Sequence, residues 1–238
     1  MFKVRKIIPA ALLLTSISSA AFADNWNIGA SASYANIDGT AKDTQTTSAG
    51  PTVAQTRGAT SGDADFPFAS IFVEYVKTLD KNLDLIIGLD YVPFKAEIDS
   101  KSFADRNISL SKSGEDSTPA TGTRTAKLEL ENYATLYLQP TYKVSGGTAV
   151  FGKVGYIHGD VKVSGSNTAT GSTINATDTL NGYVVGLGIQ HNISKNVFVR
   201  LEGSYTDHDS VTATDSLGTK FTADSELIAG KLSIGYSF

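Results

Sequence analysis

The sequence predicts an all-β fold: a transmembrane, antiparallel, up-and-down β-barrel of about eight strands. Three observations indicate it. Apolar and polar residues alternate with a period of two along most of the chain, short and long connections alternate, and the last residue is an aromatic one, Phe238. A period of two places successive side chains on opposite faces of a strand. Strands can cross a bilayer only as a closed barrel, because closure leaves no unpaired edge in lipid.

The start of the chain has the pattern of a secretory signal peptide, predicted to span residues 1–23 and to be cleaved off. An apolar run, IIPAALLLTSI, follows the basic start, and Ala21 and Ala23 provide the small residues of the cleavage signal. The run is shorter than the roughly 20 residues of a membrane-spanning helix. The basic start consists of Lys3, Arg5 and Lys6. Residues 24–238 are then expected to form a single barrel domain.

Charge and cysteine content exclude several classes of function. The chain has 20 basic and 24 acidic residues, and the predicted signal peptide removes three basic residues and no acidic one, which leaves a net charge of about −7. Nucleic acid is therefore not expected as a partner, because its phosphates require a basic surface. The chain has no cysteine, so disulfides, thiolate metal sites and cysteine nucleophiles are excluded.

The first and last strands show the alternation most clearly. In NWNIGASASYANI one face is apolar and the other is small and polar, and the segment that ends in KLSIGYSF repeats this pattern. Each predicted strand exceeds the roughly 9 to 11 residues that a tilted strand needs to cross the hydrocarbon layer. The remaining strands are predicted near residues 66–78, 82–98, 126–143, 148–163, 178–192 and 196–209.

The connections between these strands alternate in length. The short ones are TLDKN, SGGT and NISKN. The long ones are polar and run over Asp38–Asp65, Asp99–Thr125, Ser164–Thr177 and Ser210–Ala223. Short periplasmic turns and long extracellular loops are typical of outer-membrane barrels. We therefore expect four long loops at the cell surface.

The charged residues within the strands are predicted to face the lumen, since their neighbours on the opposite face are apolar. A charge inside a bilayer needs water or a partner, so a set of both signs should form pairs. Lys153, Arg200 and Lys231 are the expected cationic centres, with Glu74, Glu131, Asp84 and Glu202 competing as acceptors. The predicted cluster comprises Glu74, Asp84, Asp90, Glu129, Glu131, Lys153, Arg200, Glu202 and Lys231.

Aromatic residues recur near the ends of the predicted strands. Their amphipathic rings favour the level of the lipid headgroups, where they would form two interfacial girdles. The residues are Trp26, Tyr34, Tyr75, Tyr91, Tyr142, Tyr183, Tyr205, Tyr236 and Phe238.

The last strand carries the one motif of the chain. Lys231, Ser233, Tyr236 and Phe238 resemble the terminal pattern of the small outer-membrane β-barrels of Gram-negative bacteria, the group of the OmpA transmembrane domain, OmpX, Opa and NspA-like proteins. The family usually has glycine where Ser233 stands. As an architecture, the resemblance covers the whole mature chain. It implies an outer-membrane location and contact with outer-membrane lipid and lipopolysaccharide. It also implies periplasmic chaperones and a barrel-assembly machinery that reads Tyr236 and Phe238.

Deletion of Phe238 is therefore expected to leave the protein in the periplasm, because an outward-facing aromatic residue would be missing from the recognised strand. Cell fractionation measures this. Normal insertion of the truncated chain would contradict the assembly role.

Three classes of function remain open. A lipid A-modifying enzyme would need a histidine beside a serine nucleophile, and His191 lies near Ser194, but at a short turn and with two residues between them. His208 between Asp207 and Asp209 is interpreted as part of a solvated acidic rim, not a metal site, and His158 as interfacial. We expect no catalytic, metal or cofactor site.

The second class is a small porin or narrow channel for ions and small solutes. A barrel of about eight strands is just wide enough for side chains to fill, and Phe72, Tyr133, Tyr137 and Phe151 are predicted to do so together with Arg200. The leading hypothesis is therefore a largely filled barrel that displays polar loops for membrane integrity, adhesion, or contact with a host, phage or other surface ligand.

Overall fold

A computed structural model describes residues 25–46, 54–56, 60–108, 120–168, 171–214, 216 and 220–238. The predicted signal peptide, with Ala21 and Ala23, lies outside these residues, as do parts of the four long connections. No helix in the described ranges is long and apolar enough to span a membrane.

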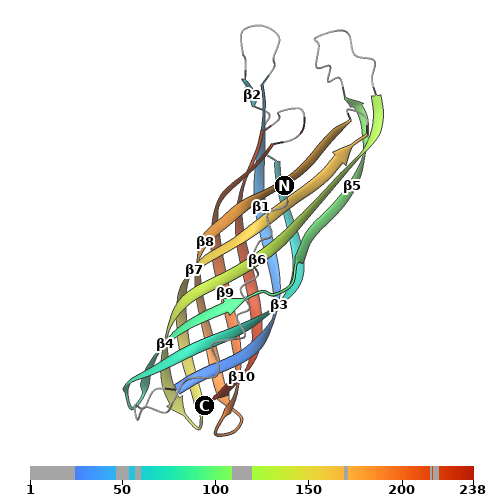
Figure 1. The fold of residues 1–238 in the computed structure, drawn as a ribbon. Helices are drawn as coiled ribbons and strands as arrows, with labels where there is room; N and C mark the ends of the chain where they lie inside the picture. The colour runs from blue at the N-terminus through green and yellow to red at the C-terminus, as the bar shows by residue number, and fades with distance from the viewer. Residues whose placement is uncertain are drawn as a thin grey trace, which may run out of the picture.

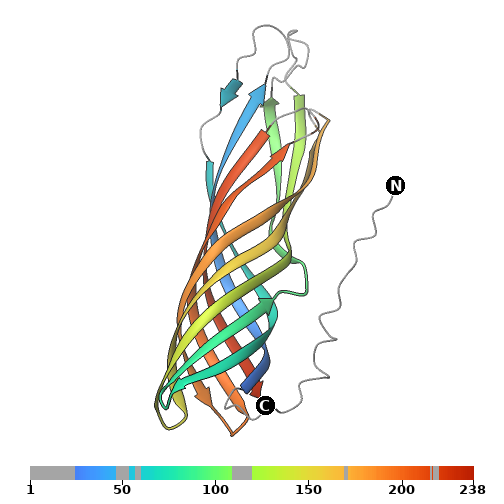
Figure 2. The same cartoon turned by 60° about the vertical axis from the view of Figure 1, so that its left-hand side comes forward.

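The described chain forms one antiparallel sheet that closes on itself through pairing of its first and last long strands, β1 and β10 (Figures 1 and 2). Its ten strands are β1 (Asn25–Thr46), β2 (Ala54–Thr56), β3 (Thr60–Asp80), β4 (Leu83–Tyr91), β5 (Ala96–Ile108), β6 (Ala120–Ser145), β7 (Thr148–Asn167), β8 (Ser172–Asn192), β9 (Val197–Thr214) and β10 (Lys220–Ser237).

Eight positions around the ring account for these ten strands. The short β2 pairs with the end of β1, and β4 and β5 pair one after the other with β6, so that they share a position. The predicted up-and-down barrel is confirmed, and the segment predicted at residues 82–98 is the one that is interrupted. We call the end with the short connections the turn end and the opposite end the loop end.

The long connections are shorter than predicted, because the strands continue beyond the segments whose outward residues are apolar. β1 extends to Thr46 and β3 begins at Thr60, so the predicted Asp38–Asp65 loop is partly barrel wall. β5, β6, β7, β8, β9 and β10 extend into the other three predicted loops in the same way. The alternation persists there, but with small or polar residues that sequence reasoning assigned to loops.

In the half toward the turn end, the apolar face of each strand points outward. Among the exposed side chains are Leu187 (74%), Leu232 (60%) and Leu201 (56%), whereas Ser31, Ser233 and other polar side chains of the opposite face are buried inside the ring. Such an outward apolar band is what a barrel presents to lipid.

The outward aromatic side chains bound this band. Trp26 lies directly opposite Tyr75 near the turn end, and both are half-buried, whereas Tyr142, Tyr236 and Phe238 at the same end are exposed. Tyr34, Tyr183 and Tyr205 lie on the loop-end side.

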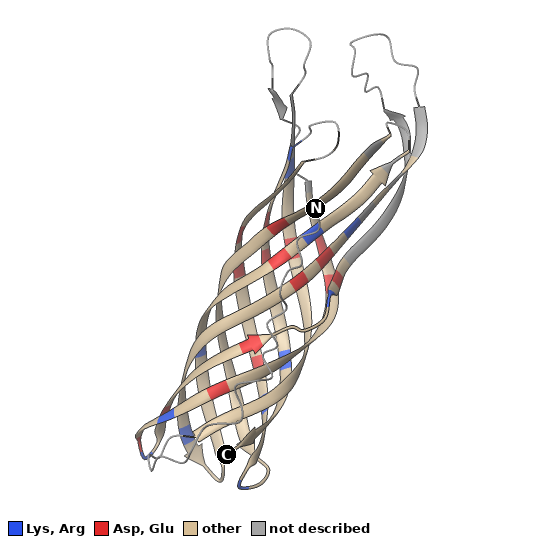
Figure 3. Ribbon diagram, viewed as in Figure 1, with Lys and Arg blue, Asp and Glu red and all other residues tan. Residues whose placement is uncertain are grey.

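A row of exposed carboxylates lies just beyond Tyr34 and Tyr205. Asp63 is opposite Asp38, Asp38 is opposite Glu226, and Glu226 is opposite Asp207, across four neighbouring strands. Figure 3 shows many acidic positions in this part of the wall. Since carboxylates are costly in hydrocarbon, this row marks the limit of the lipid-facing band.

Near this limit the interior changes from polar to apolar. The apolar core begins about three residues before the row, at Ala35 and Ala229, and beyond the row polar residues face outward. The core includes Ala35, Phe66, Val92, Ala96, Ile98, Leu130, Tyr133, Ile157, Leu180, Val184, Leu227 and Ala229. This part of the barrel is therefore built like the core of a water-exposed domain.

The wall is irregular at one place. β4 ends at Tyr91, the chain runs outward through Val92–Lys95, and β5 begins at Ala96 (Figure 2). Opposite this break, β6 has a bulge at Asn132, whose φ is 53°. Among the described residues, no ladder joins β5 to the part of β3 that precedes Ile71. We call this the β3/β5 seam.

Candidate functional site: the lumen and the closing strand

The centre of the lumen is closed by a buried ion pair. Arg200 Nη1 and Nη2 donate to the two carboxylate oxygens of Glu74 at 2.7 and 3.1 Å, and the exposed fractions of the two residues are 2% and 0%. Tyr137 Oη and Asn27 Nδ2 also donate to Glu74, at 2.6 and 2.9 Å. Arg200 further donates to Gln190 Oε1. The charges are thus satisfied without water.

Aromatic rings surround this pair. The Arg200 guanidinium carbon lies 5.0, 5.3 and 5.6 Å from the ring centroids of Phe198, Phe151 and Phe72. Each ring lies against a glycine directly opposite on a neighbouring strand, and a Cβ there would come within 2.3 Å of the ring. The pairs are Phe198 with Gly235, Phe151 with Gly188, and Phe72 with Gly29. The ion pair and these rings together form the lumen plug.

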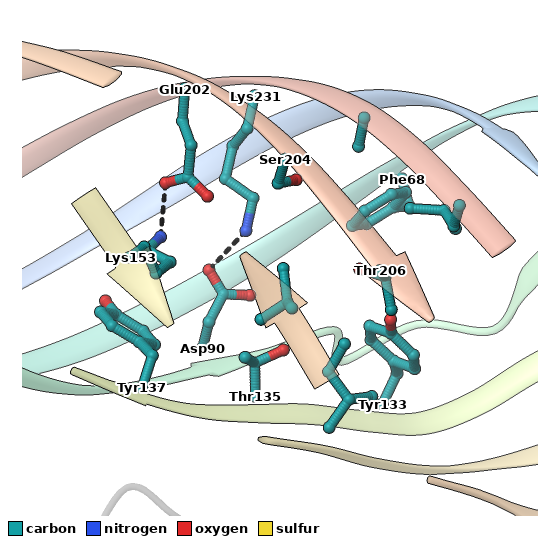
Figure 4. A pocket seen from close by; sticks show the side chains of 14 residues that line it. Phe68, Asp90, Tyr133, Thr135, Tyr137, Lys153, Glu202, Ser204, Thr206 and Lys231 are labelled. Carbon is teal, nitrogen blue, oxygen red and sulfur yellow. Dashed lines mark hydrogen bonds and ion pairs between the residues drawn. The ribbon is translucent and has the colours of Figure 1, made fainter. Parts of the chain in front are cut away.

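Two more ion pairs lie beside a small cavity on the loop-end side of the plug (Figure 4). Lys153 Nζ donates to Glu202, and Lys231 Nζ donates to Asp90 Oδ2 at 3.0 Å. The cavity has a volume of about 40 Å³. Besides these four side chains, its lining includes Phe68, Ile157, Val184 and Leu227. The cavity is therefore polar on one side and apolar on the other.

At the turn end, Asp84 faces the lumen and pairs with Lys143 at 2.8 Å. The structure thus brings Glu74, Asp84, Asp90, Lys153, Arg200, Glu202 and Lys231 into the lumen, in separate pairs. Sequence reasoning did not select Lys143, nor Asp90 as the acceptor for Lys231. Register decides such partners, and alternation does not reveal it.

The prediction was wrong for Glu129 and Glu131, which lie on the outer face. The bulge at Asn132 adds one residue to β6, so that Leu130 enters the apolar core and its neighbours point outward. Glu131 pairs with Lys95 at 2.6 Å, and Glu129 with Lys127 at 3.0 Å. The hydrogen bond to Glu131 raises the pKa of the exposed Lys95 amine.

The closing strand places the four terminal-pattern residues on two faces. Ser233 is inside and accepts a hydrogen bond from Ser31 at 2.9 Å, and Lys231 forms its lumen pair. Tyr236 and Phe238 point outward with stacked rings. The backbone of Phe238 exchanges two hydrogen bonds with Trp26. Phe238 is thus also the last link of the ring closure.

The three histidines do not form a common site. His191 contacts Thr148, whereas the Ser194 hydroxyl accepts backbone N–H groups of its own turn. His158 contacts Asn181 on the outside. The interpretation of His208 as part of a solvated rim was wrong, because its ring is buried in the lumen.

His208 lies within hydrogen-bond distance of Tyr133 and Ser225. Its neighbours Asp207 and Asp209 are exposed on the outer face. In the described ranges, no group of three or more His, Asp or Glu side chains could hold a metal ion.

The sequence profile of the family described as "Outer membrane protein beta-barrel domain" matches residues 9–237. No curated protein matches the chain.

Several solved structures are similar to the chain. OprG, an outer membrane protein of Pseudomonas aeruginosa, shares 13% sequence identity, with a TM-score of 0.52 and coverage of 90% of this chain and 95% of that one. The outer membrane protease OmpT of Escherichia coli shares 12%, with a TM-score of 0.49 and coverage of 89% and 97%. Ail, the attachment invasion locus protein of Yersinia pestis, shares 14%, with a TM-score of 0.40 and coverage of 87% and 98%. At these identities, the likeness to OprG supports the fold alone.

Proposed function

The chain belongs to the outer membrane protein beta-barrel domain family, and from this premise we propose that it is a non-conducting barrel that displays its loop end at the bacterial surface. As an outer-membrane barrel it is in contact with lipid. The proposal adds that lipopolysaccharide surrounds it and that the barrel-assembly machinery and periplasmic chaperones insert it. It also assigns surface contacts, such as adhesion, to the loop end, and it includes no catalytic activity.

The lumen plug is the observation that carries this proposal. Ions could pass through the ring only by displacing Arg200 and Glu74, both almost completely buried and joined by two charge-assisted hydrogen bonds. Phe72, Phe151 and Phe198 fill the space around them. An interior of this size is filled by side chains, whereas water-filled porins have 16 or more strands. The opposed candidate, a narrow channel, requires this plug to open.

Two experiments test the proposal, one on the purified protein and one on whole cells. We expect the refolded wild-type protein to give no stable conductance steps in a planar bilayer. A variant with both Glu74→Ala and Arg200→Ala is expected to conduct, because it removes the ion pair from the centre of the plug without leaving an unpaired buried charge. A Lys95→Met variant is the control, since its ion pair lies outside the ring.

Surface display is tested by cysteine labelling on whole cells. The wild-type protein gives no background labelling, because the chain has no cysteine. Thr173→Cys at the loop end should react with a membrane-impermeant maleimide, and Lys195→Cys at a short turn should react only after the cells are opened. Steady wild-type conductance would favour the channel instead. Labelling of Lys195→Cys on intact cells would reverse the proposed orientation.

A further inference from the structure

Within the described ranges, the β3/β5 seam leaves two facing strand edges, one of β3 and one of β5, with no ladder between them. β3 pairs with β1 from Thr60 to Val76, but on its other edge it pairs with β4 only from Ile71 onward. β5 pairs with β6, and the described residues show no ladder between β5 and β3. Where other neighbouring strands are held by hydrogen bonds, these two are held by side-chain packing.

The seam begins on the lipid-facing side of the carboxylate row. Its lower end is the last ladder pair, Ile71 with Tyr91, and the side chain of Ile71, eight residues along β3 from Asp63, is 49% exposed. There the chain runs outward through Pro93, which has no backbone N–H to contribute, and Phe94, whose side chain is 71% exposed. The seam therefore begins at the lipid-facing wall of the barrel and continues toward the carboxylate row.

Behind the seam lie apolar side chains. Val92, Ala96 and Ile98 belong to the apolar core on one side, and Phe66 and Phe68 contribute from β3 on the other. The cavity shown in Figure 4 lies beside the lower end of the seam, because Phe68 of β3 and Asp90 of β4 are part of its lining.

The cavity has two chemically different sides. Ile157, Val184 and Leu227 form part of its apolar side, and the ammonium groups of Lys153 and Lys231 lie on its polar side. Each ammonium group is paired with one acidic residue, Glu202 or Asp90, and because it has three N–H donors it can also donate to a further anionic group beside that partner. The lining thus matches a molecule that has an apolar chain and a single anionic head.

We propose that the β3/β5 seam is a lateral opening through which a small anionic amphiphile, such as a medium-chain carboxylic acid, passes between the lipid-facing wall and this cavity. Its chain lies against the apolar core, and its head lies at Lys231 and Lys153. The closed cavity of about 40 Å³ has room for about three water molecules, so binding requires the seam to part. The lumen plug stays in place, and the inference is independent of ion conduction.

A tryptophan reporter inside the ring tests this proposal. The chain has one tryptophan, Trp26. In a Trp26→Phe background, Phe68→Trp places a reporter in the lumen and Leu232→Trp places a control on the lipid face. Both proteins are put in lipid nanodiscs and titrated with a brominated medium-chain fatty acid, which quenches tryptophan on contact. We expect loss of fluorescence at both positions. Quenching at 232 without quenching at 68 would overturn the proposal.

Cross-linking then shows whether the acid passes the seam. Ala69 and Pro93 lie two residues beyond the last ladder pair, one on each side of the seam, and both are exposed. Bridging Ala69→Cys to Pro93→Cys, by a disulfide or a short bis-maleimide, should abolish quenching at 68 and leave quenching at 232. The matched control bridges Ile71→Cys to Tyr91→Cys, which are already paired in the ladder, and should change neither. Unchanged quenching at 68 in the bridged seam variant would refute the lateral route.

A second quencher, a brominated phospholipid, shows whether the amphiphile comes from the bilayer or from the medium. A brominated phospholipid cannot leave the bilayer, so quenching at 68 by this lipid would place the source in the outer leaflet. Quenching by the free acid alone would place it in the medium. Either result supports the opening, and failure of both quenchers at 68 overturns it.

Discussion

Replacing Arg200 by methionine is expected to destabilise the barrel by about 3–5 kcal/mol, because Glu74 would remain as a buried charge without its partner. Glu74 is completely buried and accepts hydrogen bonds from Arg200, Tyr137 and Asn27. The two donors that remain are neutral and cannot replace the guanidinium. Urea unfolding of the protein in lipid vesicles, followed by tryptophan fluorescence and gel mobility, measures the change in free energy.

Two further variants show whether the loss comes from the unpaired charge. Adding Glu74→Gln to Arg200→Met should recover part of the stability, since no buried charge is then left unpaired. Lys95→Met breaks an ion pair in which the lysine is exposed, and should have little effect because exposed pairs contribute little. If Arg200→Met unfolds at the same urea concentration as Lys95→Met, the plug does not stabilise the barrel.

The second large effect is expected for Gly29→Val. A Cβ at position 29 would lie 2.3 Å from the Ile234 carbonyl oxygen and 2.3 Å from the Phe72 ring. The ring is confined by its packing against Phe198, and the carbonyl belongs to the strand that closes the ring. We expect destabilisation of about 3 kcal/mol, at the upper end of the range for overpacked cores, or failure to fold. The heat-modifiable gel mobility and the urea midpoint measure this.

Gly230→Val is the matched control in the same part of the sheet. Gly230 faces outward, and a Cβ there meets no atom within 4 Å. Since glycine weakens a strand interior, this variant should be as stable as the wild type or slightly more stable. The smaller change Gly29→Ala should also lower stability, and adding Phe72→Leu to it should restore part of the lost stability. If Gly29→Val folds as well as Gly230→Val, the fit of ring against glycine is not required.

Where one face of a strand meets lipid, the alternation of apolar and polar residues predicted correctly which side chains face the lumen. A wrong face there exposes polar groups to hydrocarbon, at a cost of several kcal/mol each, so few exceptions are tolerated. This is why Arg200, Glu202 and Lys153 could be assigned to the lumen and Leu201 to the outside. It is also why the outward aromatic residues, from Trp26 to Phe238, could be selected.

Beyond the lipid the same reasoning failed. There an outward residue needs only to tolerate water, and Asp38 and Asp63 were taken for parts of a loop although they belong to strands. One added residue at Asn132 was enough to reverse the faces of Glu129 and Glu131. The positive φ that makes this bulge has no signature in composition or period.

The order of residues therefore defines the barrel, its two faces and its closing strand, because each of these depends on local alternation and on the large free-energy difference between lipid and water. Contacts across the ring depend on register, and a shift by two residues leaves every face unchanged. Three features follow only from the register and closure of the folded ring: the pairing of Arg200 with Glu74, the fit of Phe72 over Gly29, and the seam without a ladder between β3 and β5.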